Sequence, residues 1–236
     1  MKKRLMAAVL STAMAATMLL TGSISVQAAD AAAANDPAVE LIFTSVSVSG
    51  DSHTEAMYEF ADKVEELSGG SVTCKCYDNG SLFSSENEFD ALLNGDADLA
   101  YISFPTIATQ IPSYSMFASG YLFSSYEHMT SVLNGDIGLN KIRPQIEETL
   151  NIKPLSSFYL GSRVINTREK EINSYDDMNG LLLRMPNSEA WLFLGEALGA
   201  NPTPLSFSEL YTALQTGAVD AQDNPLPSIE SANFYE

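Results

Sequence analysis

Arg184 is the residue in this sequence best suited to bind a ligand through charge. It follows the apolar run 181–183 and stands two residues before Pro186, where a strand is predicted to end and a helix to begin. A guanidinium presents a planar fork of donors that matches a carboxylate, and it stays charged at any working pH. Free amides at a helix N-terminus add to such a site. The sequence therefore favours an anion site at Arg184, although a surface ion pair with Asp176 or Asp177 fits the spacing equally well.

The charge balance makes any positive cluster informative. The 236 residues carry 12 basic and 30 acidic side chains, for a net charge of −18, and removal of residues 1–28 with their three basic groups takes it to −21. Such a field repels nucleic acid and anionic membrane surfaces, so we expect no nucleic-acid partner. An anionic ligand must be captured by local charge, and four of the nine remaining basic residues lie within 22 positions: Arg163, Arg168, Lys170 and Arg184.

Enzymatic and metal-binding patterns are scarce. The two histidines, His53 and His128, belong to no HExxH motif, and the sequence contains no GxSxG elbow and no GxxxxGKS phosphate loop. We expect no catalytic residues, no metal and no cofactor. Cys74 and Cys76 would share one face of a strand, where a disulfide between them would be strained, so a buried strand is favoured over a metal site.

The N-terminus has the features of an export signal. A basic segment, Lys2 to Arg4, precedes an apolar run over 5–20, and Val26 to Ala28 fits a small-residue cleavage site, which predicts a signal peptide at 1–28. A retained membrane anchor is the weaker alternative, because the run is short and broken by hydroxyl residues. Residues 20–23 resemble a lipoprotein box with Ser23 in place of the cysteine, which excludes lipid attachment there. We expect a monomeric exported protein, in the periplasm or at the extracellular face of the cytoplasmic membrane, with a disordered mature N-terminus over 29–40.

Residues 41–160 predict a first α/β lobe. Strands are expected at 41–48, 71–77 and 99–104, with helices between them at 56–67 and 86–93, the second capped by Ser84 or Ser85. This order predicts a βαβαβ unit with crossover connections. Helices at 126–133 and 140–150 and a fourth strand at 153–160 complete this part.

Residues 161–236 predict a second α/β lobe, with a boundary near Gly161. A strand at 181–185 leads into a helix capped by Asn187 or Ser188, and Ser206 with Glu209 forms the pattern of a capping box before a helix at 209–216. A last strand is expected at 218–222, after a short connection at 200–204. The predicted fold is therefore α/β, with two α/β lobes.

Several blocks of the sequence resemble the solute-binding proteins of tripartite ATP-independent periplasmic (TRAP) transporters. They are Gly180 to Asn187, Leu198 to Leu226, Phe234 to Glu236, Asp78 to Ala100 and Gly161 to Arg163. The resemblance extends from about Leu41 to the end of the chain. It implies a periplasmic-binding-protein type II-like fold with a hinge, capture of a small organic carboxylate, and delivery to the membrane permease subunits of a TRAP transporter.

The resemblance also implies roles for individual residues. Arg184 of Arg-Met-Pro matches the arginine that pairs with the ligand carboxylate, Arg163 a second cationic contact, and Asn224 a polar contact. Weaker candidates are Asn187 and, from the first lobe, Ser49, His53, Ser85 and Ser103.

Two departures from the family pattern stand out. Members usually run longer, so the second lobe is expected to be incomplete at its C-terminus, with exposed strand edges if only this piece is made. The chain also has Gln222-Asp223-Asn224 where the family often has Gln-Glu-Asn, which keeps the charge. The alternatives are a binding component of an ATP-driven importer and an extracellular enzyme on a similar scaffold.

Overall fold

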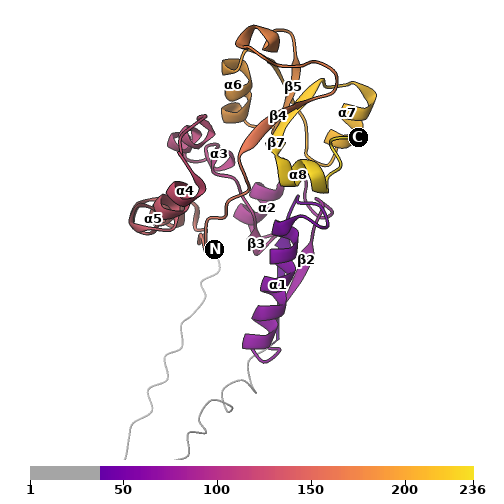
Figure 1. Ribbon diagram of the computed structural model, residues 1–236. Helices are drawn as coiled ribbons and strands as arrows, with labels where there is room; N and C mark the ends of the chain where they lie inside the picture. Colours follow the sequence, from indigo (N-terminus) through magenta and orange to yellow (C-terminus); the bar gives the residue numbers. More distant parts are fainter. Residues whose placement is uncertain (1–37) are drawn as a thin grey trace, which may run out of the picture. The chain divides into compact units, whose positions relative to one another are not determined.

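The computed structural model describes residues 38–236 (Figure 1). The predicted signal peptide, with its cleavage site and the Ser23 position, lies outside the described residues, as does most of the predicted N-terminal tail. The tail was predicted to extend to residue 40, but the first strand already begins at Val39. Within residues 38–236, no helix combines the length and the apolar character needed to span a bilayer.

A three-stranded parallel sheet organises the first half of the chain. Its strands are β1 (Val39–Thr44), β2 (Val72–Tyr77) and β3 (Leu99–Ala100), in the order β2-β1-β3. Helix α1 (Ser52–Leu67) connects β1 to β2 and runs beside β2, and α2 (Glu88–Asn94) precedes β3 (Figure 1). The predicted βαβαβ unit with crossover connections is confirmed.

Local sequence explains the bounds of α1. The side chain of Asp51 caps the helix by accepting a hydrogen bond from the backbone nitrogen of His53 at 2.8 Å, which satisfies one of the free N-terminal amides. Met57 and Ala61 are buried one turn apart, on the face that packs on the sheet. Gly69 and Gly70 follow the helix with positive φ angles of 62° and 81°, which glycine adopts without strain.

A mostly helical segment follows β3. It comprises α3 (Phe104–Ile107), η1 (Pro112–Ala118), α4 (Tyr126–Leu133), η2 (Gly138–Ile142) and α5 (Arg143–Leu150). Helix α4 has the predicted bounds, and η2 with α5 covers the helix predicted at 140–150. Phe89 of α2 packs with Tyr114 and Ile146 of this segment in one apolar cluster.

Two strand predictions in this half are wrong. The strand predicted at 99–104 stops at Ala100, because its partner β1 ends at Thr44, which pairs with Ala100. Helix α3 begins soon after, at Phe104, with Pro105 in its first turn. Residues 153–160 form no strand, since no described strand pairs with them, and the side chains of Leu155 and Phe158 remain 56% and 58% exposed.

The second half is built on a four-stranded mixed sheet. Its strands are β4 (Arg163–Thr167), β5 (Leu182–Met185), β6 (Asn201–Pro204) and β7 (Ala221–Pro225), in the order β4-β7-β5-β6. Strand β5 is parallel to β6 and β7, whereas β4 is antiparallel to β7. The short helix η3 (Tyr175–Met178) precedes β5. Helices α6 (Glu189–Ala197) and α7 (Leu210–Thr216) lie on opposite sides of the sheet, and α8 (Leu226–Ser231) follows β7 (Figure 1).

The sequence missed two strands and misplaced the caps of α2 and α7, whereas Ser188 is the cap of α6 as predicted. Strands β4 and β6 were not predicted, and β6 contains Pro202 and Pro204, which argue against a strand but are tolerated at a sheet edge. Asn87, rather than Ser84 or Ser85, is the cap of α2, and Ser188 at the cap of α6 makes no side-chain cap bond. The two residues of the predicted capping box are hydrogen-bonded, with the hydroxyl of Ser206 donating to the Glu209 carboxylate at 2.5 Å. Helix α7, however, begins only at Leu210, one residue later than predicted.

Strand β2 carries the two cysteines. Both Cys74 and Cys76 are unpaired and half-buried, and burial, together with the neighbouring Cys74, raises the pKa of the Cys76 thiol to about 11. A thiol with so high a pKa is protonated at neutral pH and reacts slowly. Among the described residues, no group of three or more His, Cys, Asp or Glu side chains is placed to hold a metal ion.

Glu88, in the first turn of α2, is an unusual buried acid. Its side chain is 3% exposed and faces Thr44 at the end of β1, which is fully buried. Burial raises the pKa of Glu88 from 4.5 to about 8, against the weaker effect of Thr44, which favours the ionised form. Glu88 is therefore largely neutral at pH 7.

Glu88→Gln should remove one component of the pH dependence of stability. Between pH 4.5 and 8 the folded state holds a proton on Glu88 that the unfolded chain has lost, so the free energy of unfolding falls as pH rises through this window, by about 1.4 kcal/mol per pH unit at most. Urea unfolding at several pH values should show a flatter profile for Glu88→Gln than for wild type. The exposed control Glu59→Gln should keep the wild-type profile; an unchanged profile in Glu88→Gln would show that Glu88 is ionised in the fold.

Candidate functional site

The predicted arginines and Asn224 meet at one edge of the four-stranded sheet. Because β5 and β7 are parallel, Arg184 near the end of β5 and Asn224 near the end of β7 lie at the same edge. Strand β4 runs the other way, so its first residue, Arg163, pairs in register with Pro225 at this edge. The topology thus brings together residues that lie up to 61 positions apart in the sequence.

Arg184 is buried inside the sheet. Its side chain is 2% exposed, alternates along β5 with the buried Leu183 and Met185, and donates from Nε to the backbone oxygen of Leu205 at 2.8 Å. No acidic side chain among residues 38–236 lies within ion-pair distance of it. Burial first, and then the nearby charge of Arg163, lowers the pKa of Arg184 to about 10, so the guanidinium remains charged at neutral pH without a direct counter-ion.

Arg163, in contrast, is paired with Asp223. Its Nε and Nη2 donate to the two carboxylate oxygens of Asp223 at 3.0 and 2.7 Å, a bidentate geometry, and Nη2 also donates to the backbone oxygen of Asp223. The guanidinium lies over the ring of Trp191 in α6, 4.7 Å from its centroid, which adds a cation–π contact. Asp223 therefore neutralises the charge of Arg163, and Asp223 and Trp191 together hold its guanidinium in one orientation.

Asn224 is buried in a hydrogen-bonded row. Its Nδ2 donates to Gln222 Oε1 at 2.7 Å, and its Oδ1 accepts from Arg163 Nη2 at 3.2 Å. Gln222 in turn donates to Asn166 of β4 at 3.4 Å. These bonds hold the polar side chains of β7 in place, although Gln222 and Asn224 are almost completely buried.

The weaker candidates are spread over several loops and the first turn of α1. Asn187 is exposed just after β5. Ser49 donates to Asp78 at 2.8 Å, and Ser103, at the start of α3, bonds Thr106. His53 packs edge-on against Tyr101, with Nδ1 3.3 Å from Asp51.

Among residues 38–236, Ser85 is the one weaker candidate that hydrogen-bonds to the chain near Leu205, the backbone partner of Arg184. Its hydroxyl accepts from the backbone nitrogen of Phe207 at 3.4 Å. Phe207 lies two residues after Leu205, whose oxygen binds Arg184. None of the eight predicted ligand contacts is tested by the geometry of a bound molecule, so all eight stay predictions.

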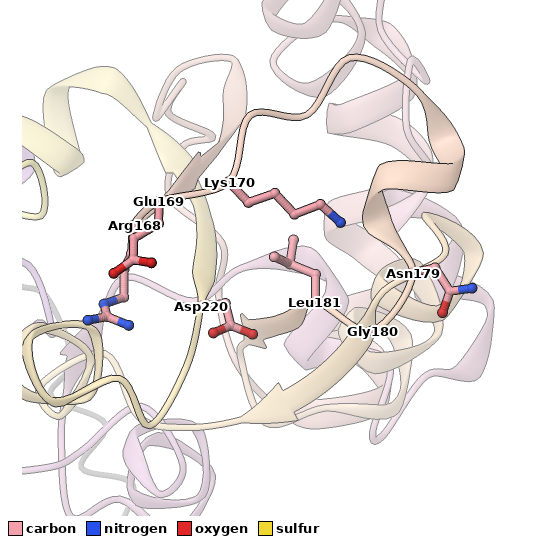
Figure 2. Close-up of a pocket in the computed structure, with 7 residues that line it drawn as sticks. All are labelled: Arg168, Glu169, Lys170, Asn179, Gly180, Leu181 and Asp220. Carbon is pink, nitrogen blue, oxygen red and sulfur yellow. The ribbon is translucent and has the colours of Figure 1, made fainter.

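A separate cavity of about 300 Å³ opens at the opposite edge of the same sheet (Figure 2). It is lined where β4 ends and where β5 and β7 begin, by Arg168, Glu169, Lys170, Asn179, Gly180, Leu181 and Asp220. Asp220 is already engaged, because it accepts a bond from the backbone nitrogen of Leu182 at 2.9 Å, and Lys170 donates to the backbone oxygen of Asp177. None of the eight predicted ligand contacts lines this cavity.

Sequence reasoning missed the residues that support the arginines. Asp223 was read only as a replacement that keeps the charge, and Trp191 was not among the predicted contacts. Both contacts require β4 to pair antiparallel with β7, and β4 itself was not predicted. The one usable signal was the match in charge between Arg163 and an acid adjacent to Asn224 in the sequence.

Comparison with known proteins identifies the family. Residues 43–236 match the model of the bacterial extracellular solute-binding protein family 7, DctP. The chain belongs to this family. It is 34% identical over 176 residues to the sialic acid-binding periplasmic protein SiaP of Vibrio cholerae, an alignment that covers 75% of this chain and 54% of SiaP. The chain thus spans about half the length of this curated relative.

Solved structures agree with the family assignment. A TRAP periplasmic solute-binding protein from Roseobacter denitrificans, with bound 3-deoxy-D-manno-oct-2-ulosonic acid, is 40% identical, with a TM-score of 0.78 over 84% of this chain and 65% of that one. The sugar acid binding protein DctPAm from Advenella mimigardefordensis, in complex with galactonate, is 31% identical, with a TM-score of 0.79. The match covers 84% of this chain and 64% of DctPAm. A TRAP periplasmic solute-binding protein from Sulfurospirillum deleyianum, with bound succinate, is 27% identical, with a TM-score of 0.76. The match covers 84% of this chain and 63% of that protein. These neighbours confirm the predicted α/β fold of the periplasmic-binding-protein type II-like class.

Asp223→Ala should destabilise this solute-binding protein, because it leaves Arg163 unpaired beside the buried Arg184. The side chains of Arg163 and Asp223 are 25% and 7% exposed, and loss of such a partly buried pair should lower the free energy of unfolding by about 2 kcal/mol in urea titrations. The matched control is Glu66→Ala, which breaks the exposed Lys63–Glu66 pair and should cost less than about 0.5 kcal/mol. Equal costs for the two variants would refute the structural role of the Arg163–Asp223 pair.

Proposed function

We propose that this protein is an exported solute-binding protein that captures a small organic carboxylate on Arg184 and delivers it to a TRAP-type membrane permease. The observation that carries the proposal is the buried guanidinium of Arg184 without an ion-pair partner among residues 38–236. A buried charge without a counter-ion is costly, and a ligand carboxylate would supply the missing negative charge.

The geometry of Arg184 suits such a ligand. Nε is used by the oxygen of Leu205, and no hydrogen bond from either terminal nitrogen to a described residue is present. A carboxylate bound by both terminal nitrogens would form the bidentate pair that arginine favours. Asn224, held 3.2 Å from Arg163 at the same edge, would supply a polar contact nearby. Arg163 would act beside them, although its charge is shared with Asp223.

The relatives support both the ligand class and the location. Three of the relatives are periplasmic binding proteins, with sialic acid, 3-deoxy-D-manno-oct-2-ulosonic acid and succinate as their ligands. The fourth is a sugar acid binding protein in complex with galactonate, and all four ligands carry a carboxylate. We infer export to the periplasm, or to the outer face of the cytoplasmic membrane, and a partnership with the membrane subunits of a TRAP transporter. The named relatives are binding proteins rather than enzymes, in agreement with the absence of catalytic patterns from the sequence.

Arg184→Lys should abolish most of the stabilisation by ligand. A carboxylate at 100 times its dissociation constant should stabilise the wild-type exported protein by roughly 2.7 kcal/mol, which raises the melting temperature by several degrees. Lysine keeps the charge but loses the two-pronged contact, so the shift should largely disappear in thermal unfolding against a panel of carboxylates.

Arg168→Lys is the matched control, because Arg168 lines the cavity at the opposite edge of the sheet. This variant should retain the wild-type shift. A full ligand-induced shift in Arg184→Lys, or its loss in Arg168→Lys alone, would contradict the assignment of the carboxylate to Arg184.

A further inference from the structure

Two segments that lie next to the sheet edge of Arg184 make contact with the start of α1. One is residues 158–162, which lead into the first residue of β4, and the other is α8, which follows β7 directly after Pro225. The two segments touch each other at Gly161, because a Cβ atom there would lie 2.6 Å from Cβ of Pro225. Because no loop separates α8 from β7, the position of α8 affects the end of β7, where Asn224 lies.

Asp51 joins α8 to α1 through the two oxygens of its carboxylate. Oδ1 accepts from the backbone nitrogen of His53 at 2.8 Å and caps α1, whereas Oδ2 accepts from the hydroxyls of Ser228 and Ser231, both at 3.5 Å. Asp51 and Ser228 are each only 5% exposed. Among residues 38–236 no other group donates to Oδ2, so loss of both hydroxyls would leave a buried carboxylate oxygen without a donor.

The contact between α8 and α1 is polar rather than apolar. Ile229, the buried apolar residue of α8, packs with Leu210 and Val219 of the second half. Toward α1 a cavity of about 350 Å³ opens instead, and its lining comprises Gly50, Asp51, Ser52, Pro227, Glu230 and Ser231. Among the described residues, the hydrogen bonds that join α8 to the start of α1 are therefore those of Asp51.

His53, in the first turn of α1, contacts the other segment. Its ring lies edge-on to the rings of Tyr101 and Phe158, with centroids 5.6 and 6.3 Å away. Phe158 belongs to the segment that leads to Arg163. The turn from Asp51 to His53 thus contacts both segments that adjoin the sheet edge of Arg184.

We propose that Asp51 is a positioning residue for the carboxylate site. By holding α8, its carboxylate keeps the end of β7, and with it Asn224, where it acts together with Arg184 on the ligand. Asp51 exerts this effect through α8 and needs no contact with the ligand. Without the hold, a smaller fraction of the molecules has the binding-competent arrangement, and the apparent affinity falls by that fraction. This inference rests on the proposed function, because it takes Arg184 as the anchor of the ligand.

The test removes the contact from each of its two sides. Ser228→Ala combined with Ser231→Ala deletes both donors and leaves the cap of α1 intact, whereas Asp51→Ser deletes Oδ2 and keeps a residue type that caps helices well. The probe is the tightest binder among sialic acid, 3-deoxy-D-manno-oct-2-ulosonic acid, galactonate and succinate. In calorimetric titrations of the exported protein, each variant should bind it about fivefold or more weakly than wild type. All the changes combined should cost no more affinity than Asp51→Ser alone, because they remove one and the same interaction.

Ser68→Ala is the matched control, because the Ser68 hydroxyl bonds the backbone of Glu65 and Val72 at the other end of α1. It should lower the free energy of unfolding in urea but leave the affinity unchanged at a temperature where every variant is folded. An unchanged affinity in either α8-contact variant, additive losses on their combination, or an equal loss in Ser68→Ala would overturn this inference, while loss of binding in Arg184→Lys would keep the proposed function intact. Failure of every carboxylate in the panel to bind through Arg184 would overturn the proposed function, and this inference with it.

Discussion

A positive charge buried in a β-sheet is the constraint on which this structure depends. Arg184 lies in β5 between two buried apolar residues, Leu183 and Met185. Its own side chain is also almost completely buried. The fold supports this charge with a backbone oxygen rather than a carboxylate. The compensation is incomplete, and an anionic ligand is the simplest species to complete it.

The neighbouring Arg163 solves the same physical problem in a different way. Its carboxylate partner, its hydrogen bond to Asn224 and the face of Trp191 fix the guanidinium before any ligand arrives. Two arginines at one sheet edge would repel each other, and Asp223 offsets this repulsion. One arginine is thus held as part of the framework, while the terminal nitrogens of the other make no hydrogen bond to a described residue. The same sheet separates this site from the cavity at its opposite edge, where Asp220 and Lys170 already bind the backbone.

The sequence predicted the parts of this arrangement that depend on local patterns. Apolar periodicity located α1, α4 and β5, and the parallel order of the first sheet followed from alternating strands and helices. Arg184 was found because an arginine that interrupts an apolar run before Pro186 is conspicuous in an acidic chain. Arg163 and Asn224 came from the family resemblance rather than from periodicity.

What the sequence did not predict depends on long-range pairing. Strand β4 gains its structure from the antiparallel contact with β7, and only that contact brings Asp223 to Arg163. Strand β6 is rich in proline and exists because β5 supplies a parallel partner. The converse case is residues 153–160, whose composition favours a strand but which have no partner among the described residues. The burial of Glu88 is likewise a tertiary effect, because its place in α2 appears in sequence as an ordinary first-turn acid.

The most direct test of this account is a crystal structure of the exported protein with a tightly binding sugar acid. The account predicts that both carboxylate oxygens lie about 2.7–2.9 Å from the terminal nitrogens of Arg184, with the Arg163–Asp223 pair intact. A carboxylate bound instead in the cavity lined by Arg168 and Lys170, or one that displaces Asp223 from Arg163 and leaves Arg184 without an anion, would contradict it.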